Sequence, residues 1–155
     1  MPSDRPPRGR LVSPPSQDPD PPLHRQPRVL LAVALGGAVG APLRHGLGLV
    51  VPAAGSGFPT GTLLVNLLGC LLLGALVEGL ALGARPGTPA ARYARPFAGS
   101  GLLGAFTTYS TFAVETDRLL AQGRAGPALA YVLVSLLGGL LAAAGGVIAA
   151  RRVWS

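Results

Sequence analysis

The sequence predicts an all-α membrane protein with four transmembrane helices, the third of which is broken. Charged residues make up only 12% of the 155 residues, about half of the quarter that is usual in soluble domains. The mean hydropathy is +0.47. The apolar residues gather in four segments, each long enough to cross a hydrocarbon core that needs about 20 residues. The third segment is interrupted by glycines and hydroxyl side chains, which predicts the break.

The amino-terminal part differs in composition from everything that follows. Residues 1–27 hold nine of the 16 prolines and few large apolar side chains, so they cannot bury a core and are predicted to be a disordered tail. Residues 28–152 are predicted to be the transmembrane domain. A signal peptide formed by the tail and the first apolar segment is the alternative, but that segment is long and contains Arg44.

The four predicted spans share a length of about 23 residues and short connections. They cover about 29–51, 60–82, 96–120 and 128–150. The connections at 52–59 and 83–95 are rich in Gly and Pro, which is typical of turns. The last connection, "DRLLAQGRAGP", is short.

Arginines outside the spans predict the orientation. All 13 basic residues are Arg. Four spans place Arg25, Arg28, Arg85, Arg92, Arg95, Arg151 and Arg152 near one face, and only Arg118 and Arg124 clearly at the other. Basic residues favour the cytoplasmic side, so both termini are predicted to be cytoplasmic and the chain to lie in the cell membrane. The pI near 11.3 reflects these flanking arginines rather than nucleic-acid binding.

Polar residues inside the first two spans are the first candidate site residues. Arg44 is unfavourable in an apolar span unless it snorkels to the surface or lines an electropositive vestibule, and both readings stay open. Asn66 is either a hydrogen-bonding link between helices or a pore-lining amide. Glu78 lies near a helix end and is expected at headgroup level. Cys70 is interpreted as a small packing residue.

The stretch "GLLGAFTTYSTFAVET" at 101–116 carries the strongest signal. A break in a spanning helix exposes backbone N–H and C=O groups, so it persists only inside protein or around an ion. Beyond the break, Tyr109 and Phe112 share one helical face, while Thr111 and Glu115 share a neighbouring face. Spacing alone favours aromatic packing, with threonines bonding back to the preceding turn. In the fourth span, Tyr131, Ser135 and Gly139 form one stripe.

Three motifs in order resemble the Fluc (CrcB) family of fluoride channels. They are "GGAVGAPLRHGL", "PTGTLLVNLLGCLLLG" and "GLLGAFTTYSTFAVET". The resemblance implies a fluoride-selective channel for passive export, built from two four-helix subunits inserted antiparallel in the bilayer. It also implies a structural sodium ion at the dimer centre, held by the backbone carbonyls of Gly104 and Thr107 and by those of the partner.

The resemblance further implies a fluoride pathway. Asn66 donates its amide, and Tyr109 and Phe112 take the places of two pore phenylalanines. Thr111 and Ser135 provide hydroxyl donors, Arg44 provides the basic vestibule, and Glu115 orients the threonines and Asn66. The sequence departs from the family pattern in two places. Tyr109 stands where a Phe is expected, and Gly139 stands where the family often has a hydroxyl.

The arginine asymmetry adds a hypothesis about the partner. A subunit that inserts in both directions needs a weak charge bias, whereas this chain has a marked one. We therefore expect a fixed orientation and pairing with a homologous subunit of opposite bias, rather than with a second copy.

Other function classes fit the sequence less well. A small four-helix multidrug exporter, the main alternative, needs a mid-membrane carboxylate, and Glu115 is the only candidate. An enzyme would need a cluster of nucleophile, base or metal ligands, which the two histidines and one cysteine do not provide. A purely structural membrane protein is a further alternative.

Overall fold

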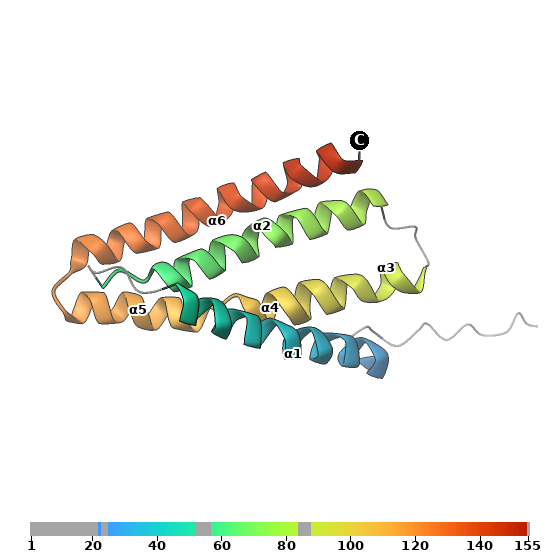
Figure 1. Ribbon diagram of the computed structural model, residues 1–155, viewed down its shortest axis with the longest axis horizontal. Coiled ribbons are helices and arrows are strands. Elements are labelled where there is room, and N and C mark those ends of the chain that lie inside the picture. Colours follow the sequence, from blue (N-terminus) through green and yellow to red (C-terminus); the bar gives the residue numbers. More distant parts are fainter. Residues whose placement is uncertain (1–21, 23–24, 52–56, 84–87, 155) are drawn as a thin grey trace, which may run out of the picture.

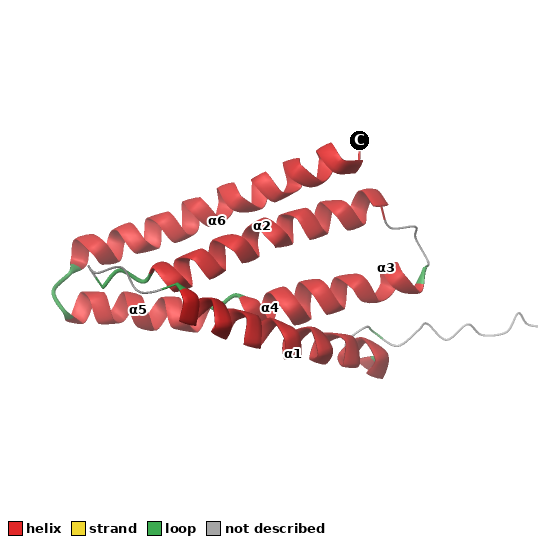
Figure 2. Cartoon of the chain, viewed as in Figure 1, coloured by secondary structure: helices red, strands yellow, loops and turns green. Residues whose placement is uncertain are grey.

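The protein is a bundle of long helices that lie side by side, and the third is interrupted halfway (Figure 1; Figure 2). The structure is a computed structural model that describes residues 22, 25–51, 57–83 and 88–154. The predicted disordered tail 1–27 lies almost entirely outside the described residues. Of the predicted connection 83–95, residues 84–87, which include Arg85, also lie outside them, whereas Pro89–Ala94 are helical and a π-helix begins at Arg95, so the third span begins earlier than predicted.

Three unbroken helices are long and apolar enough to cross a membrane. They are α1 (Pro27–Val50), α2 (Thr60–Gly83) and α6 (Ala125–Trp154). At about 1.5 Å per residue, the shortest of them spans about 36 Å, more than a hydrocarbon core of about 30 Å. The prediction of these three spans is confirmed, although α6 extends four residues beyond the predicted end at 150.

The third span is assembled from four consecutive pieces. They are α3 (Pro89–Ala94), the π-helix η2 (Arg95–Leu103), the single turn α4 (Gly104–Phe106) and α5 (Tyr109–Ala121). Between α4 and α5 the backbone is extended, with ψ of 161° at Thr107 and 124° at Thr108. The predicted break is confirmed, and it lies at the two threonines.

Two pairs of elements make most of the packing. Helix α2 packs against α6, and α1 packs against η2 and α4. Glycines permit the close approach, because a Cβ at Gly146 would collide with the carbonyl of Leu71, and one at Gly101 would meet that of Val33. Gly99 and Gly101 lie within the π-helix η2, where Gly101 permits the close contact with α1, and Gly104 begins the single turn before the break.

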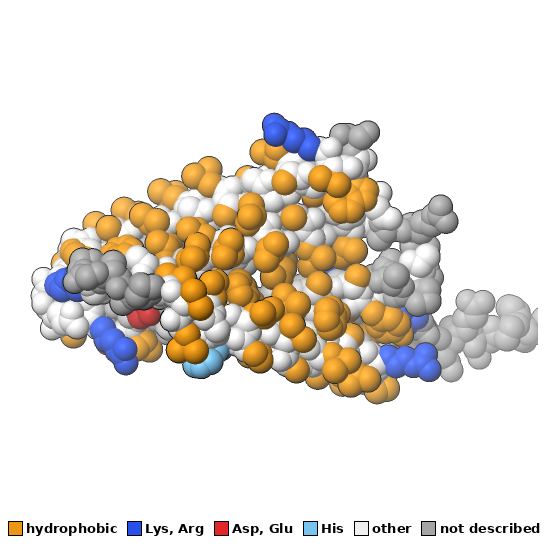
Figure 3. Space-filling model, in the orientation of Figure 1, with side chains coloured by type: hydrophobic (Ala, Val, Ile, Leu, Met, Phe, Trp, Pro, Cys, Tyr) orange, Lys and Arg blue, Asp and Glu red, His pale blue; other side chains and the backbone are white. Residues whose placement is uncertain are grey.

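Most large apolar side chains point outward rather than into a core. Figure 3 shows hydrophobic side chains along the whole visible face, with arginines near the ends of the bundle. The core that does form is small, and it centres on Leu119, Ala128 and Tyr131, with Phe58 and Phe112 among the partly buried side chains packed against it. Water is a poor solvent for such a surface, so lipid or a partner subunit must cover it.

Candidate functional site

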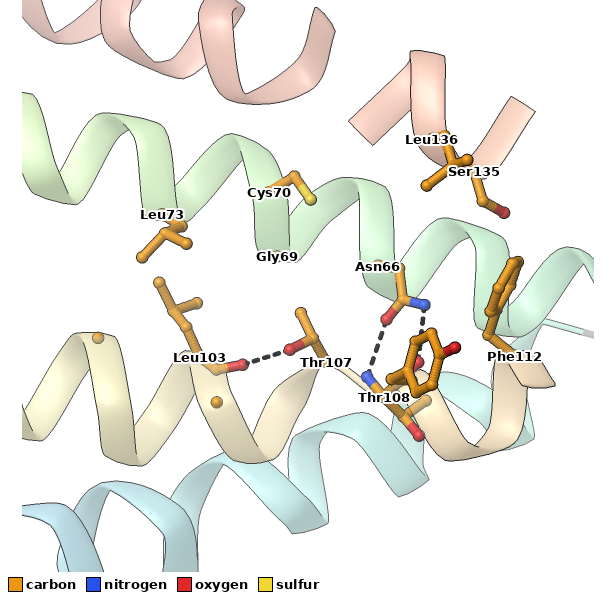
Figure 4. Close-up of a pocket in the computed structure, with 13 residues that line it drawn as sticks. Asn66, Gly69, Cys70, Leu73, Leu103, Thr107, Thr108, Phe112, Ser135 and Leu136 are labelled. Atoms are coloured by element: carbon orange, nitrogen blue, oxygen red, sulfur yellow. Dashed lines mark hydrogen bonds between the residues drawn. The ribbon is translucent and has the colours of Figure 1, made fainter. Parts of the chain in front are cut away.

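The break in the third span is held by one side chain from α2. Asn66 donates from Nδ2 to the carbonyl of Thr108 and accepts at Oδ1 from the N–H of the same residue, both at 2.9 Å. The amide therefore gives the N–H of Thr108 the acceptor that the extended backbone cannot provide, and gives its carbonyl a donor in addition to the one from α5. The reading of Asn66 as a link between helices is confirmed, and the residue also borders a cavity (Figure 4).

Thr108 begins the helix that follows the break. Its Oγ1 accepts from the N–H of Thr111 at 3.2 Å, which is the bond expected of an N-cap residue. The same hydroxyl lies 3.0 Å from Oγ1 of Thr111 and 3.3 Å from Oγ of Ser110. Thr107 instead donates from its hydroxyl back to the carbonyl of Leu103 at 2.9 Å. The threonine run thus serves the backbone on both sides of the break.

These bonds leave two carbonyls without their usual helical donors. The N–H of Thr108, which would close a turn on Gly104, is used by Asn66. The N–H of Thr111, which would close a turn on Thr107, is used by the Thr108 hydroxyl. Gly104 is exposed in the single chain and Thr107 is half-buried. Near the middle of the third span, the Gly104 and Thr107 oxygens therefore lack their helical donors, and the Thr107 oxygen receives instead only a long hydrogen bond from Arg44.

A cavity of about 370 Å³ opens beside the break. Four predicted pathway residues line it, namely Asn66, Tyr109, Phe112 and Ser135, together with Gly104, Thr107, Thr108 and Cys70. Among its described lining residues, none is Asp, Glu, Arg or His. The Ser135 Oγ is buried and has no hydrogen-bond partner in the described part of the chain. An unpaired buried hydroxyl is unfavourable, which indicates that something else hydrogen-bonds there.

Aromatic rings form one wall of this cavity. The Phe112 ring lies 6.0 Å from that of Tyr109 and 5.1 Å from that of Tyr131, measured between centroids. Tyr131 is fully buried, whereas Tyr109 is 81% exposed. An aromatic ring that projects from the middle of an apolar bundle is available for contact with lipid or with a partner subunit.

A second cavity of about 410 Å³ lies on the other side of Thr108 and is lined by charged groups. Arg44, Thr111 and Glu115 face it, so the seven predicted pathway residues divide between two cavities that share Thr108. Glu115 accepts from the hydroxyl of Thr62 at 2.9 Å and from that of Tyr131 at 2.8 Å. The structure thus links Glu115 to Thr62 and Tyr131 rather than to Asn66, which corrects that part of the prediction.

Arg44 reaches the break from α1. Its Nη1 lies 3.5 Å from the carbonyl of Thr107, a long hydrogen bond. The side chain is half-buried and lines the second cavity beside His45. Of the two sequence-based readings, the structure favours an inward guanidinium that makes this cavity electropositive over one that snorkels to the surface. Glu78, expected at headgroup level, pairs with Arg151 at 2.8 Å near the end of the bundle.

Sequence reasoning missed two residues that organise the site. Thr62 was not singled out, because a lone threonine in an apolar span has no distinctive spacing. Thr108 was seen as one of several hydroxyls, although a threonine three residues before Thr111 at a helix start is a recognisable N-cap signal. Cys70, interpreted as a packing residue, lines the first cavity.

Comparison with known proteins places these features in a family. The model of the family described as CrcB-like protein, Camphor Resistance (CrcB), matches residues 31–147. The chain belongs to the CrcB-like family. The match begins within α1 and ends within α6, so it includes both cavities of this CrcB-like chain and leaves out the predicted tail.

Several curated relatives are similar to this CrcB-like chain over most of its length. The fluoride-specific ion channel FluC 2 of Geobacillus kaustophilus is 44% identical over 79% of this chain and 93% of its own length. The fluoride-specific ion channel FluC of Hyphomonas neptunium is 45% identical over 81% and 97%. That of Chloroflexus aurantiacus is 43% identical over 73% and 87%. The resemblance stated from the sequence motifs is therefore confirmed.

Proposed function

We propose that this protein is a subunit of a fluoride-selective ion channel that exports fluoride passively. The relatives named as fluoride-specific channels, 43–45% identical along the helical part, carry this proposal. The cavity beside the break agrees with it, because its polar groups are amide and hydroxyl donors and no described carboxylate lines it to repel an anion. A carboxylate-coupled multidrug exporter is disfavoured because Glu115 is engaged by two hydroxyls.

The lining groups offer a substitute for the hydration shell of a small anion. An asparagine amide has two N–H donors, and Asn66 uses one of them for Thr108, so the second can face an ion. The unpaired Ser135 hydroxyl is another donor. The edges of the Tyr109 and Phe112 rings carry partial positive charge and can also contact an anion.

The second cavity serves the same pathway in this proposal. Arg44 raises the electrostatic potential there and attracts anions towards the break. Thr111 adds a hydroxyl, and Glu115 holds Thr62 and Tyr131 in place rather than meeting the ion directly. Export then needs no chemical step, because a negative-inside potential of 100 mV favours the exit of one anion by about 2.3 kcal/mol. The proposed activity is transport and not enzymatic catalysis.

A sodium ion is proposed as a structural component at the dimer centre. The carbonyls of Gly104 and Thr107 lack their helical donors and fit such an ion, since neutral backbone oxygens suit a hard monovalent cation and the bond from Arg44 to Thr107 is long. Two carbonyls are too few to surround it, so the same pair from a second subunit would complete the shell. Bound there, the ion would neutralise carbonyl dipoles that otherwise face the apolar interior.

The partner is proposed to be an antiparallel subunit. The exposed Tyr109 ring and the exposed Gly104 both lie on the face that such a subunit would cover. The arginine asymmetry favours a homologous chain of opposite bias over a second copy, with both termini of this chain in the cytoplasm and the protein in the cell membrane. A tag at the carboxyl terminus that is found equally on both membrane faces would contradict a fixed orientation.

Reconstitution tests the function directly. The purified chain is placed alone in liposomes, and fluoride efflux is followed with an electrode, with chloride efflux as the control. Fast efflux of fluoride only would support the channel and show that two identical copies suffice. Efflux that appears only after co-reconstitution with a homologue of opposite charge bias would support pairing. No fluoride efflux in either case contradicts the proposed function.

A further inference from the structure

The first cavity contains a polar side chain to which the proposed pathway gives no role. Cys70 lies one helical turn after Asn66 on α2 and borders the same cavity as Asn66 and Ser135 (Figure 4). It is the only cysteine of the chain. A cysteine in an apolar helix is by itself a packing residue, so its surroundings decide what it does.

The first relevant observation concerns the polar stripe of α6. At the level of Cys70, the residue of this stripe is a glycine and therefore has no side chain. Tyr131 and Ser135 present hydroxyl groups one turn apart, and the next position of the stripe is Gly139. A Cβ built on Gly139 would lie 3.4 Å from the Cys70 sulfur. The sulfur therefore stands beside the place where the next polar group of the stripe would be.

The second observation is independent of the cysteine. The Ser135 Oγ is buried, borders the cavity and has no hydrogen-bond partner in the described part of the chain. Such a hydroxyl indicates a ligand in the cavity, because buried polar groups are normally satisfied. An anion that contacts Ser135 and moves one turn towards the end that carries the termini next meets Cys70, which borders the cavity, whereas Gly139 is buried behind it.

We propose that the Cys70 thiol lines the anion pathway and provides, at the level of Gly139, the polar group that this glycine lacks. The inference rests on the proposed channel function and extends it by one residue. A thiol is a weak donor, yet a weak donor is better for a dehydrated anion than an apolar wall. Its sulfur can also be modified specifically by thiol reagents, which makes the position testable.

The test uses the full-length protein in the membrane assembly that conducts, treated with methyl methanethiosulfonate. The cysteine sulfur attacks the S-methyl sulfur of the reagent, forms a mixed disulfide and releases methanesulfinate. We expect labelling to abolish most fluoride efflux and dithiothreitol to restore it. The control is Cys70→Ala combined with Leu140→Cys, because Leu140 is on the outer face of α6 and is 70% exposed. Labelling of that variant should leave efflux unchanged.

A second pair of variants tests the polar role without a reagent. Cys70→Ala should lower fluoride efflux by about two- to tenfold, which corresponds to one lost hydrogen bond. Adding Gly139→Ser to Cys70→Ala returns a hydroxyl to the same place from α6 and should recover efflux, whereas adding Gly139→Ala should not. Wild-type efflux from Cys70→Ala, or undiminished efflux from protein whose complete labelling is shown by mass spectrometry, would overturn the proposal.

Failure of the channel function itself gives a different result. In that case the untreated wild-type protein does not conduct fluoride. The rate at which Cys70 reacts with the reagent then tests whether its thiol lines an anion site. Fluoride should slow the labelling of Cys70 in the wild-type protein but not of the cysteine introduced by Leu140→Cys. Equal rates with and without fluoride, or no labelling of the folded wild-type protein, would show that Cys70 is a packing residue.

Discussion

Replacing Asn66 by Ala removes the side chain that holds the helix break. Both ends of the Asn66 amide bond to the backbone of Thr108 at 2.9 Å. Alanine provides neither bond, and Thr108 is buried, so water cannot easily replace the amide. The variant leaves the N–H of Thr108 unpaired in the middle of the bundle and removes one of the donors to its carbonyl, which as the N-cap carbonyl keeps its bond within α5.

The size of the effect follows from these two groups. In membrane proteins, one side-chain hydrogen bond contributes about 0.6 kcal/mol on average and at most about 1.7 kcal/mol. Two bonds to one residue therefore give about 1–3.5 kcal/mol, and we expect a loss of about 2 kcal/mol in the free energy of unfolding. A loss of this size lowers the ratio of folded to unfolded protein about thirtyfold.

The assay is reversible unfolding in mixed detergent, with helix content followed as sodium dodecyl sulfate is added. The matched control is Leu64→Ala, since Leu64 lies on the same helix and is 37% exposed. Fluoride efflux from liposomes is measured on both variants, and only Asn66→Ala should lose it. If Asn66→Ala and Leu64→Ala unfold at the same detergent fraction, the two bonds do not hold the break and the reasoning is wrong.

Three further substitutions, one of them with a control variant, test packing, exposure and the carboxylate of the second cavity. Gly146→Ala forces a methyl group against the carbonyl of Leu71 and should reduce stability by about 1–3 kcal/mol. The control is Gly126→Ala, because a Cβ at Gly126 has no other atom within 4 Å. This variant should leave the detergent midpoint of unfolding unchanged or raise it slightly. Tyr109→Phe should change stability by less than about 0.5 kcal/mol because the ring is 81% exposed, while fluoride efflux changes if its hydroxyl meets the ion. Glu115→Gln retains one acceptor oxygen for its two donors, so thermal melting should show a modest loss of stability and flux assays a larger loss of fluoride efflux.

The architecture was largely predictable because it depends on quantities that add up along the chain. Hydropathy over about 20 residues identifies a span whatever the helix packs against, so α1, α2 and α6 appeared close to their observed ends. The break was predictable for a local reason as well. Adjacent threonines weaken a helix, and the second of them can begin a new one as its N-cap.

The contacts of the site were less predictable because they join residues far apart in sequence. From spacing, Asn66 could either link two helices or line a pore. In the structure it links α2 to the break and also lines the first cavity. Spacing also grouped Glu115 with Thr111, whereas its bonds go to Thr62 on α2 and Tyr131 on α6. The partner of a polar side chain depends on which faces of two helices meet. Small residues at the helix contacts determine those faces.

Composition and order alone therefore determined that the chain crosses the membrane four times, that its third crossing is broken at the threonines, and that its motifs are those of the CrcB-like family. Only the tertiary structure decided that Asn66 holds the break, that the polar residues divide between two cavities, and that Cys70 stands beside Gly139. The reason is physical. Partitioning into lipid is a sum over a segment, whereas a hydrogen bond or a cavity wall needs particular atoms from different helices within a few ångströms.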